Sequence, residues 1–294
     1  MVELENKPQD RVRSRNMSYK IVVDSCCELP EEFKKQDKFE SVPLGLEVGD
    51  YQTMDDDNFN QAEFLERIAK CPTCPKSSCP SPERYMEAYK ADVDNIYVVT
   101  LSSHLSGSYN SAVLGKNLYE EAYGKKNIHI VDSESASGGE TQIALLAAEL
   151  EEQGLPFEEI VERLEEYRSA MHTIFVLDNL ETLRKNGRLS RVKALVATTL
   201  SIKPVLASDK GNIVQIGQGV GNKKALQKMV DIIMKEVTDL DKKRLIMTHC
   251  NCAERAAKVK EMLEERAKIK EIMILDTGGL STMYANDGGI IIAV

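Results

Sequence analysis

Apolar and polar residues recur with two different periods along the first half of the chain. Short apolar runs of strand length alternate with longer segments whose apolar residues recur every three or four positions, the spacing of a helix with one buried face. The expected strands are 19–24, 41–50, 95–100 and 126–132. The expected helices are 59–70, 83–91, 106–123 and 139–154. Because strands alternate with helices, we predict a parallel sheet covered by helices on both faces.

The pattern changes after about residue 170. Residues 156–172 form an amphipathic segment that predicts a bridging helix. Beyond it the expected strands are 172–178, 203–209, 212–219, 243–250 and 271–276, and the expected helices are 223–237 and 254–268. The turn signal Asp209–Gly211 predicts a hairpin. We therefore expect an N-terminal α/β domain over 18–170 and a C-terminal mixed α+β domain over 171–294, after a loose leader over 1–17.

Composition narrows the class of protein. A chain of 294 residues with 42% hydrophobic and 29% charged residues is typical of a globular protein of roughly two domains. The net charge of −9 disfavours a nucleic-acid partner, since phosphate binding needs clustered Lys and Arg. No apolar run approaches the ~20 residues that span a bilayer, and the polar first seventeen residues lack the apolar centre of a signal peptide. We expect a cytoplasmic protein without a transmembrane segment.

The seven cysteines are odd in number and fall in a reducing compartment, which disfavours a disulfide framework. Three of them, Cys71, Cys74 and Cys79, lie close together in CPTCPKSSC. A C-x-x-C pair with a third cysteine is compatible with zinc or redox chemistry, but a structural zinc site needs four ligands and no second pair follows. We interpret these residues as reduced thiols without a metal, and keep a thiol or zinc site as an alternative.

The stretch LSSHLSGSYNSA, residues 101–112, carries six hydroxyl groups directly after an expected strand. Capping of the next helix by Ser106 or Ser103 explains one or two of them. Several short donors beside Gly107 at a helix N-terminus suit an anion, which would be a phosphate, a carboxylate or a sulfate. Ligands of parallel sheets bind at the carboxyl ends of the strands, where Asp24–Ser25 and Asp132–Ser137 also lie.

A serine enzyme is the competing interpretation of the same stretch. Ser106 or Ser108 would need a neighbouring base to act as a nucleophile. The chain has only four histidines that could serve as this base, and it has no G-x-S-x-G motif. A second unusual segment, LDNLETLRKNGRLSR, predicts a short helix that ends at Gly187 and is followed by Arg188 and Arg191. There are two interpretations of these arginines. They form a solvated basic turn, or Arg188 makes a second contact to the anion suggested for the stretch 101–112.

Six segments together resemble one protein family. In order, they are IVVDSCCELP, SSCPSP, LSSHLSGSYNSA, IVDSESASGG, LDNLETLRKNGRLSR and SIKPVL. The chain from about Tyr19 to its C-terminus resembles the DegV family of bacterial fatty-acid-binding proteins, which act as the acyl-carrying subunit of a two-part fatty-acid kinase. The resemblance implies a long-chain, palmitate-like fatty acid in a tunnel between two α/β domains, no cofactor and no catalytic residues. Ala194–Leu200 and Ile290–Ile292 are candidate tunnel residues, and equally candidate core residues.

The resemblance also implies the residues of the head-group site. The carboxylate is expected near the serine of the L-S-G motif, Ser106–Gly107, and near a hydroxyl of the family's TSQPSP-like loop, which is Ser77 here. Arg188 is expected to approach the same group.

Many members carry a C-terminal H-x-G-P-G segment whose histidine completes the site, and this chain has no histidine there. We expect Ser281 or Thr282 to supply a neutral hydrogen bond instead. The implied partner is an ATP-binding kinase subunit that converts the bound acid to an acyl phosphate. The alternatives from other classes are a small-molecule enzyme that uses the serine-rich loop, and a thiol or zinc site at Cys71–Cys79.

Overall fold

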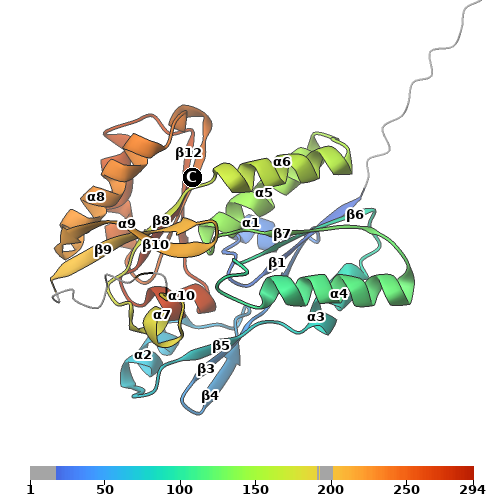
Figure 1. Cartoon of the computed structure of the whole chain (residues 1–294), viewed down its shortest axis with the longest axis horizontal. Coiled ribbons are helices and arrows are strands. Elements are labelled where there is room, and N and C mark those ends of the chain that lie inside the picture. Colours follow the sequence, from blue (N-terminus) through green and yellow to red (C-terminus); the bar gives the residue numbers. More distant parts are fainter. Residues whose placement is uncertain (1–17, 191, 193–200) are drawn as a thin grey trace, which may run out of the picture.

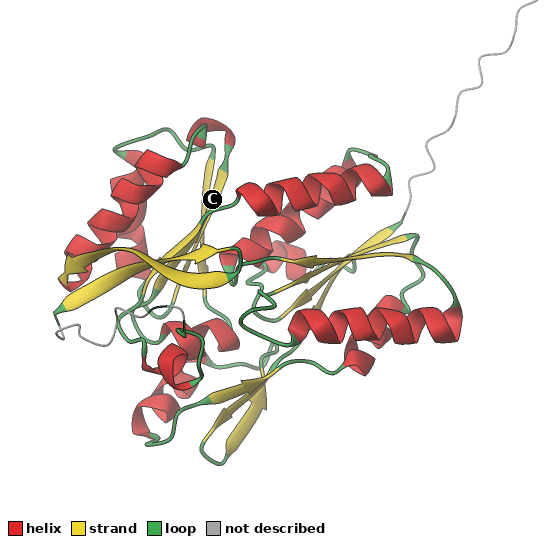
Figure 2. Ribbon diagram, viewed as in Figure 1, coloured by secondary structure: helices red, strands yellow, loops and turns green. Residues whose placement is uncertain are grey.

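The computed structural model describes residues 18–190, residue 192 and residues 201–294. The predicted leader, Arg191 and the predicted tunnel segment Ala194–Leu200 lie outside the described residues. Figure 2 shows two larger sheets side by side with helices around them, and a small sheet set apart from both.

Sheet A is the parallel sheet of the N-terminal half, with strand order β2-β1-β6-β7. Its strands are β1 (Tyr19–Asp24), β2 (Phe39–Val42), β6 (Asn95–Thr100) and β7 (Asn127–Asp132). One face packs on α3 (Pro82–Tyr89) and α4 (Ser108–Tyr123), and the other packs on α1 (Glu31–Lys34), α5 (Gly138–Glu152) and α6 (Phe157–Ala170) (Figure 1). The predicted parallel sheet with helices on both faces is confirmed.

One predicted strand of this half is wrong. The run over 41–50 does not form one strand, because β2 ends at Val42 and a separate strand, β3 (Gly45–Val48), follows. Pro43 lies between them and has no backbone N–H with which to continue the ladder. The strand β3 pairs instead with β4 (Tyr51–Met54) and β5 (Lys76–Ser78) in a three-stranded antiparallel sheet. The helix α2 (Gln61–Lys70) connects β4 to β5.

Sheet C is a mixed sheet of six strands, in the order β10-β9-β8-β13-β11-β12. Its strands are β8 (Thr173–Val176), β9 (Ile202–Asp209), β10 (Asn212–Val220), β11 (Arg244–His249), β12 (Glu271–Asp276) and β13 (Ile290–Ala293). Only β11 and β12 run parallel, and the predicted β9–β10 hairpin is confirmed. The helices α8 (Gly221–Glu236) and α9 (Ala253–Glu264) cover one face. The short elements α7 (Glu181–Lys185), η2 (Leu240–Lys242) and α10 (Gly279–Ala285) complete this half.

The helix α5 joins the two sheets. It is buried along most of its length and packs against β1 and β6 of sheet A and against β11 and β13 of sheet C. Gly138 allows the close approach to sheet C, because a Cβ there would lie 2.9 Å from Cγ2 of Ile246 on β11. All described strands of sheet C begin at or after Thr173, but α5 contacts both sheets, so the boundary at residue 170 stays a prediction.

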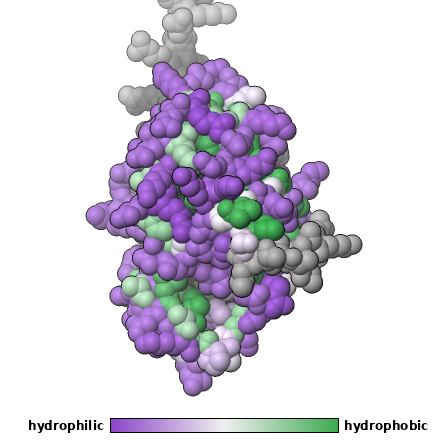
Figure 3. Space-filling view, turned by 90° about the vertical axis from the view of Figure 1, so that its left-hand side faces the viewer, coloured by the Kyte–Doolittle hydropathy of each residue, from purple (hydrophilic) through white to green (hydrophobic). Residues whose placement is uncertain are grey.

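The surface on the side of α8 is largely hydrophilic, with small apolar patches between the polar side chains (Figure 3). In the described part of the chain, no helix combines the length and the apolar character that crossing a membrane requires.

We predict that Ile143→Ala lowers the free energy of unfolding by about 2–5 kcal/mol, because Ile143 is a fully buried residue of α5 between the sheets. Urea denaturation measures this change. Ile216→Ala on β10 is the control, since Ile216 is 37% exposed, and its loss should be much smaller. Equal losses in the two variants would contradict a shared central helix.

Candidate functional site

An apolar cavity lies between the carboxyl ends of the sheet A strands and the face of sheet C that is turned away from α8 and α9. It contains about 800 Å³ of space that no protein atom fills, counted out to its open mouth. Its hydroxyl-bearing lining residues are Ser77, Ser106, Ser135, Thr173, Ser208, Ser281 and Tyr284, and Arg188 is its one charged lining residue among those described.

Part of the apolar wall of the cavity comes from alternate residues of the sheet C strands, and the rest comes from loops and short helices around it. Phe175 and Ile291 lie directly opposite each other on β8 and β13, and both line the cavity. Ile290 and Ile292 point to the other face and pack in the core under α8 and α9. Of the predicted tunnel segment Ile290–Ile292, the structure therefore brings only the middle residue to the cavity.

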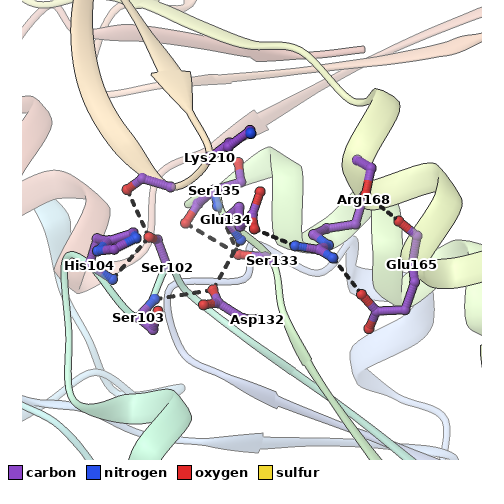
Figure 4. A network of polar contacts seen from close by, with 12 residues as sticks. Ser102, Ser103, His104, Asp132, Ser133, Glu134, Ser135, Glu165, Arg168 and Lys210 are labelled. Atoms are coloured by element: carbon purple, nitrogen blue, oxygen red, sulfur yellow. Dashed lines mark hydrogen bonds and ion pairs between the residues drawn. The ribbon is translucent and has the colours of Figure 1, made fainter.

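The serine loop, residues 101–108, runs from the end of β6 into the first residue of α4 along one side of the cavity. Asp24 holds both ends of this loop, because its Oδ2 accepts hydrogen bonds from Leu101 N at 2.9 Å and from Ser108 Oγ at 2.6 Å. In the middle of the loop, Ser103 N donates to Asp132 Oδ1 at 3.1 Å (Figure 4). Two aspartates, at the ends of the strands on either side of β6, thus fix the loop.

The β9–β10 hairpin tip is bonded to the same region. Ser102 Oγ donates to the carbonyl of Gly211 at 2.8 Å, and Ser208 Oγ donates to the carbonyl of Glu134 at 2.6 Å. Behind this contact, Arg168 bridges Glu134 and Glu165 (Figure 4). Several hydroxyl groups of the serine-rich stretch therefore serve the architecture rather than a ligand.

The deeper hydroxyl groups of the cavity already have hydrogen-bond partners in the protein. Ser281 Oγ lies 3.7 Å from Cys26 Sγ and beside the Glu28 carboxyl group, whose pKa it lowers, and the hydroxyls of Ser135 and Thr173 bond each other at 2.6 Å. Ser135 and Ser281 are 3% and 5% exposed. Since a hydroxyl has one hydrogen to donate, these groups have little left to offer an anion.

Three hydroxyl groups at the partly exposed end are different. Ser106 Oγ accepts a hydrogen bond from Ser108 N at 3.2 Å, which leaves its own hydrogen uncommitted within the described residues. Ser77 Oγ and Tyr284 Oη make a single long contact of 3.4 Å with each other. The hydroxyls of Ser77, Ser106 and Tyr284 can therefore turn toward a ligand oxygen between them.

Arg188 supplies a positive charge at this end. Its Nε donates to the carbonyl of Leu105 at 3.1 Å, its Nη1 donates to the carbonyl of Asn186 at 2.6 Å, and its Cζ lies 5.8 Å from the centre of the Tyr284 ring. Gly187, with a φ of 77°, turns the chain after α7 and so brings Arg188 to the cavity. The structure thus places Arg188 beside the serine loop rather than in an isolated basic turn.

Two other predicted residues lie outside the cavity lining. Gly107 is the residue before α4, and a Cβ there would lie 3.1 Å from the Cys79 Sγ, so glycine allows the two loops to meet. Thr282 is fully buried, and its Oγ1 lies 2.8 Å from Oγ1 of Thr277 and accepts from Nε2 of Gln61 at 3.2 Å. Thr282 therefore fastens α10 to α2.

Among the described residues, the thiols and histidines form neither a metal site nor a catalytic pair with Ser106 or Ser108. Cys71, Cys74 and Cys79 contact Thr73, Asn186 and Ser111 respectively. Within the described ranges, no group of three or more His, Cys, Asp or Glu side chains is arranged to hold a metal ion. In the same ranges, no histidine is hydrogen-bonded to Ser106 or Ser108.

Comparisons with known proteins agree with this geometry. A family model described as "Uncharacterised protein, DegV family" matches residues 18–294. The chain belongs to the DegV family. A DegV domain-containing protein of Streptococcus pneumoniae is 35% identical over 279 residues, which cover 94% of this chain and 98% of that protein.

Two solved DegV structures are similar over nearly the whole chain. One, from Ruminococcus gnavus and described with vaccenic acid, is 54% identical, has a TM-score of 0.92 and covers 95% of this chain and 100% of its own. The other is the fatty acid kinase B3 protein of Streptococcus pneumoniae loaded with linoleic acid, which is 33% identical, has a TM-score of 0.86 and covers 94% of this chain and 99% of its own.

Tyr284 lines the cavity, but our sequence analysis did not name it as a candidate. The DegV pattern H-x-G-P-G has glycine two and four residues after the histidine. In this chain Tyr284 is followed at the same spacing by Asn286, with a φ of 54°, and by Gly288, with a φ of 91°. Asparagine is a common substitute for glycine at positive φ, so this spacing was the available signal. By this spacing Tyr284 is a further candidate for the histidine position, beside Ser281 and Thr282.

Two buried carboxyl groups hold the helix that carries Tyr284. Asp55 accepts hydrogen bonds from the backbone N–H of Gly279 at 2.6 Å and of Leu280 at 2.8 Å, and Glu28 accepts from Gly278 N at 3.1 Å. Burial raises the pKa of Glu28 to about 7 and that of Asp55 to about 6, although these hydrogen bonds act in the opposite direction. The N-terminus of α10 is thus held by two carboxyl groups, Asp55 and Glu28, whose ionised forms are disfavoured by burial.

These pKa values predict a pH-dependent stability. The unfolded values are 4.5 for Glu28 and 3.8 for Asp55, so the folded protein binds more protons than the unfolded chain between about pH 4 and pH 7. The free energy of unfolding should therefore fall as the pH rises through this window. Glu28→Gln should flatten the fall in urea denaturation between about pH 5 and pH 8. Glu32→Gln, at an exposed position on α1, is the control, and an equal slope in both variants would contradict this origin.

Proposed function

We propose that this protein binds a long-chain, palmitate-like fatty acid in the cavity and presents its carboxylate to a separate ATP-binding kinase subunit. The carboxylate lies against Ser77, Ser106 and Arg188, and the acyl tail lies along the apolar face of sheet C. The observation that carries this proposal is the unequal distribution of free hydrogen-bond donors along the cavity. Uncommitted hydroxyl hydrogens and a guanidinium gather at its partly exposed end, whereas the rest of its wall is apolar or already hydrogen-bonded.

The energetics of a fatty acid fit both ends of such a cavity. Each buried CH₂ contributes about 0.8 kcal/mol, so a long tail contributes on the order of 10 kcal/mol before the entropy of binding is subtracted. A carboxylate that loses water without gaining donors is very costly. Ser77, Ser106 and Tyr284 supply neutral donors and Arg188 supplies a charged one, which together replace the lost water.

A role in acyl-phosphate formation follows from where the head group lies. Gly107 and Cys79, beside Ser106, are exposed, so a partner can reach a carboxylate bound at this end. In the proposed reaction a carboxylate oxygen attacks the γ-phosphorus of ATP on the kinase subunit, which yields the acyl phosphate and ADP. The fatty acid is itself the nucleophile, so we propose no catalytic residue and no cofactor for this cytoplasmic carrier. The similar B3 protein, described as a fatty acid kinase protein loaded with linoleic acid, supports this proposal.

The identity of the ligand can be tested directly. Purified protein is denatured and extracted with organic solvent, and the extract is examined by mass spectrometry. We expect a long-chain fatty acid at about one molecule per chain. A preparation that yields no fatty acid and does not take up added palmitate would contradict the proposal, and esterase activity of such a preparation would favour the serine-enzyme alternative.

We predict that Ser106→Ala weakens fatty-acid binding by about 1–3 kcal/mol, because the carboxylate loses a buried donor. The matched control is Ser103→Ala in the same loop, since Ser103 does not line the cavity and is bonded there through its backbone N–H. Titration calorimetry with palmitate measures both variants. Equal affinities in the two folded variants would argue against Ser106 as a head-group ligand.

Arg188→Ala should reduce fatty-acid affinity and kinase-dependent acyl-phosphate formation more than it reduces stability, since it removes the charge at the head group. Arg184→Ala on α7 is the control, because Arg184 is exposed and pairs with Glu181. Turnover with the kinase subunit and the melting temperature are measured together. If Arg188→Ala lowers only the melting temperature, Arg188 is merely structural.

Tyr284→Phe keeps the aromatic ring beneath Arg188 and removes only the phenolic hydrogen, so we expect affinity for palmitate to fall by about 1–2 kcal/mol. Tyr123→Phe on α4 is the control, because Tyr123 is 57% exposed and does not line the cavity. The comparison uses the same calorimetric titration. Unchanged affinity would remove Tyr284 from the head-group site.

A further inference from the structure

Two carboxyl groups lie buried against each other behind the serine loop. Asp24 ends β1, and Glu140 lies in the first turn of the central helix α5. Both residues are 0% exposed. The proposed function assigns no role to either of them. Neither forms an ion pair with a Lys, Arg or His among the described residues, and a buried pair of acids without such a partner is costly to keep.

The hydrogen-bond donors around this pair are distributed unequally. Asp24 accepts three hydrogen bonds, from Cys26 N at 3.1 Å, from Leu101 N at 2.9 Å and from Ser108 Oγ at 2.6 Å. Neither carboxyl oxygen of Glu140 receives an N–H or O–H donor from the described residues. The polar neighbours of Glu140 are the carboxylate of Asp24 and the thiol of Cys26, which is only a weak donor.

This asymmetry decides where the proton lies. Three donors stabilise a negative charge on Asp24, whereas nothing comparable stabilises one on Glu140. Two buried anions side by side would repel each other in a medium of low dielectric constant. Glu140 therefore holds the proton of this pair, and as a neutral acid it does not repel the Asp24 carboxylate beside it.

Asp24 in turn determines the position of Ser106. Its two contacts to the serine loop lie at the first and last residues, Leu101 and Ser108. Ser106 lies between them, and its Oγ accepts from the backbone N–H of Ser108. Any movement of Asp24 is therefore transmitted to both ends of the loop that carries the proposed head-group serine.

We propose that Glu140 is a positioning residue for the carboxylate site: its proton prevents repulsion within the pair and so keeps Asp24 in place, and Asp24 fixes the serine loop around Ser106. This inference rests on the proposed function and deepens it.

The same arrangement predicts how binding responds to pH. Burial raises the pKa of Glu140 well above its ordinary value, and the negative charges of Asp24 and Glu28 act in the same direction. The thiols of Cys26 and Cys27 also lie against this group and stay protonated, because burial raises their pKa. The N-terminus of α5 favours an anion by at most ~2 kcal/mol, which is small beside the cost of burial. At alkaline pH, ionised Glu140 repels Asp24 and loosens the loop.

The test compares Glu140→Gln with Glu140→Ala by titration of palmitate at several pH values from about 6 to 9. Glutamine is neutral and has the same shape, so Glu140→Gln should bind within a few-fold of the wild type and lose the alkaline fall in affinity. Glu140→Ala should bind about tenfold more weakly, in the range expected for a lost buried hydrogen bond. Any effect of pH on palmitate itself is common to all the proteins.

Glu151→Ala is the matched control for general destabilisation. Glu151 is a buried residue near the other end of α5, where it accepts from Asn95 and Tyr97 at 2.8 Å, away from the serine loop. It should lower the melting temperature and leave palmitate affinity unchanged. Equal affinities of Glu140→Ala and Glu151→Ala, with a flat pH profile in the wild type, would overturn the proposal.

Hydrogen exchange separates this inference from the proposed function, because it needs no ligand. The backbone N–H groups of Leu101 and Ser108 should exchange faster in Glu140→Ala than in Glu140→Gln. If the wild type binds no fatty acid but this difference appears, the proposed function fails and the positioning role stands. If the wild type binds palmitate but the two variants exchange alike, the positioning role fails alone.

Discussion

A carboxylate can leave water at low cost only where the protein already holds hydrogen-bond donors in position, and this requirement decides where in the cavity the head group can bind. The cavity wall carries many hydroxyl groups, but most of their hydrogens are already committed to the protein's own carbonyl and carboxylate oxygens. Ser77, Ser106 and Tyr284 remain, and Arg188 adds a charge beside them. The orientation proposed for the ligand follows from this inventory of donors and needs no other assumption.

The rest of the structure holds that small set of donors in place. The serine loop is bonded to Asp24 at both ends, and α10, which carries Tyr284, is held at its N-terminus by Asp55 and Glu28. Because these anchoring carboxyl groups are buried, each one lowers stability when it is ionised. Such costs are common where a binding site must be rigid, and here they lie directly behind the residues proposed to bind the head group.

The local pattern of apolar and polar residues was sufficient to predict much of the fold and part of the candidate site. The strands that end at Asp24 and Thr100 were predicted to the residue, because a fully buried parallel strand is a continuous apolar run. The strand over 41–50 was wrong because Pro43 divides it between two sheets, and hydrophobicity does not record which sheet a strand joins. Ser281 reaches the cavity, but its hydroxyl lies beside Glu28, which is 253 positions away in the chain and which no local pattern connects to it. Tyr284 was not named as a candidate because asparagine and glycine replace the pair of glycines by which the family's histidine is found.

A crystal structure of the protein loaded with palmitate tests the central claim most directly. The account predicts continuous density for the acyl chain along Phe175 and Ile291, with the carboxylate within hydrogen-bond distance of Ser77 and Ser106 and next to Arg188. A carboxylate placed instead at the buried end beside Cys26 and Ser281, or a cavity closed by protein side chains, would contradict it.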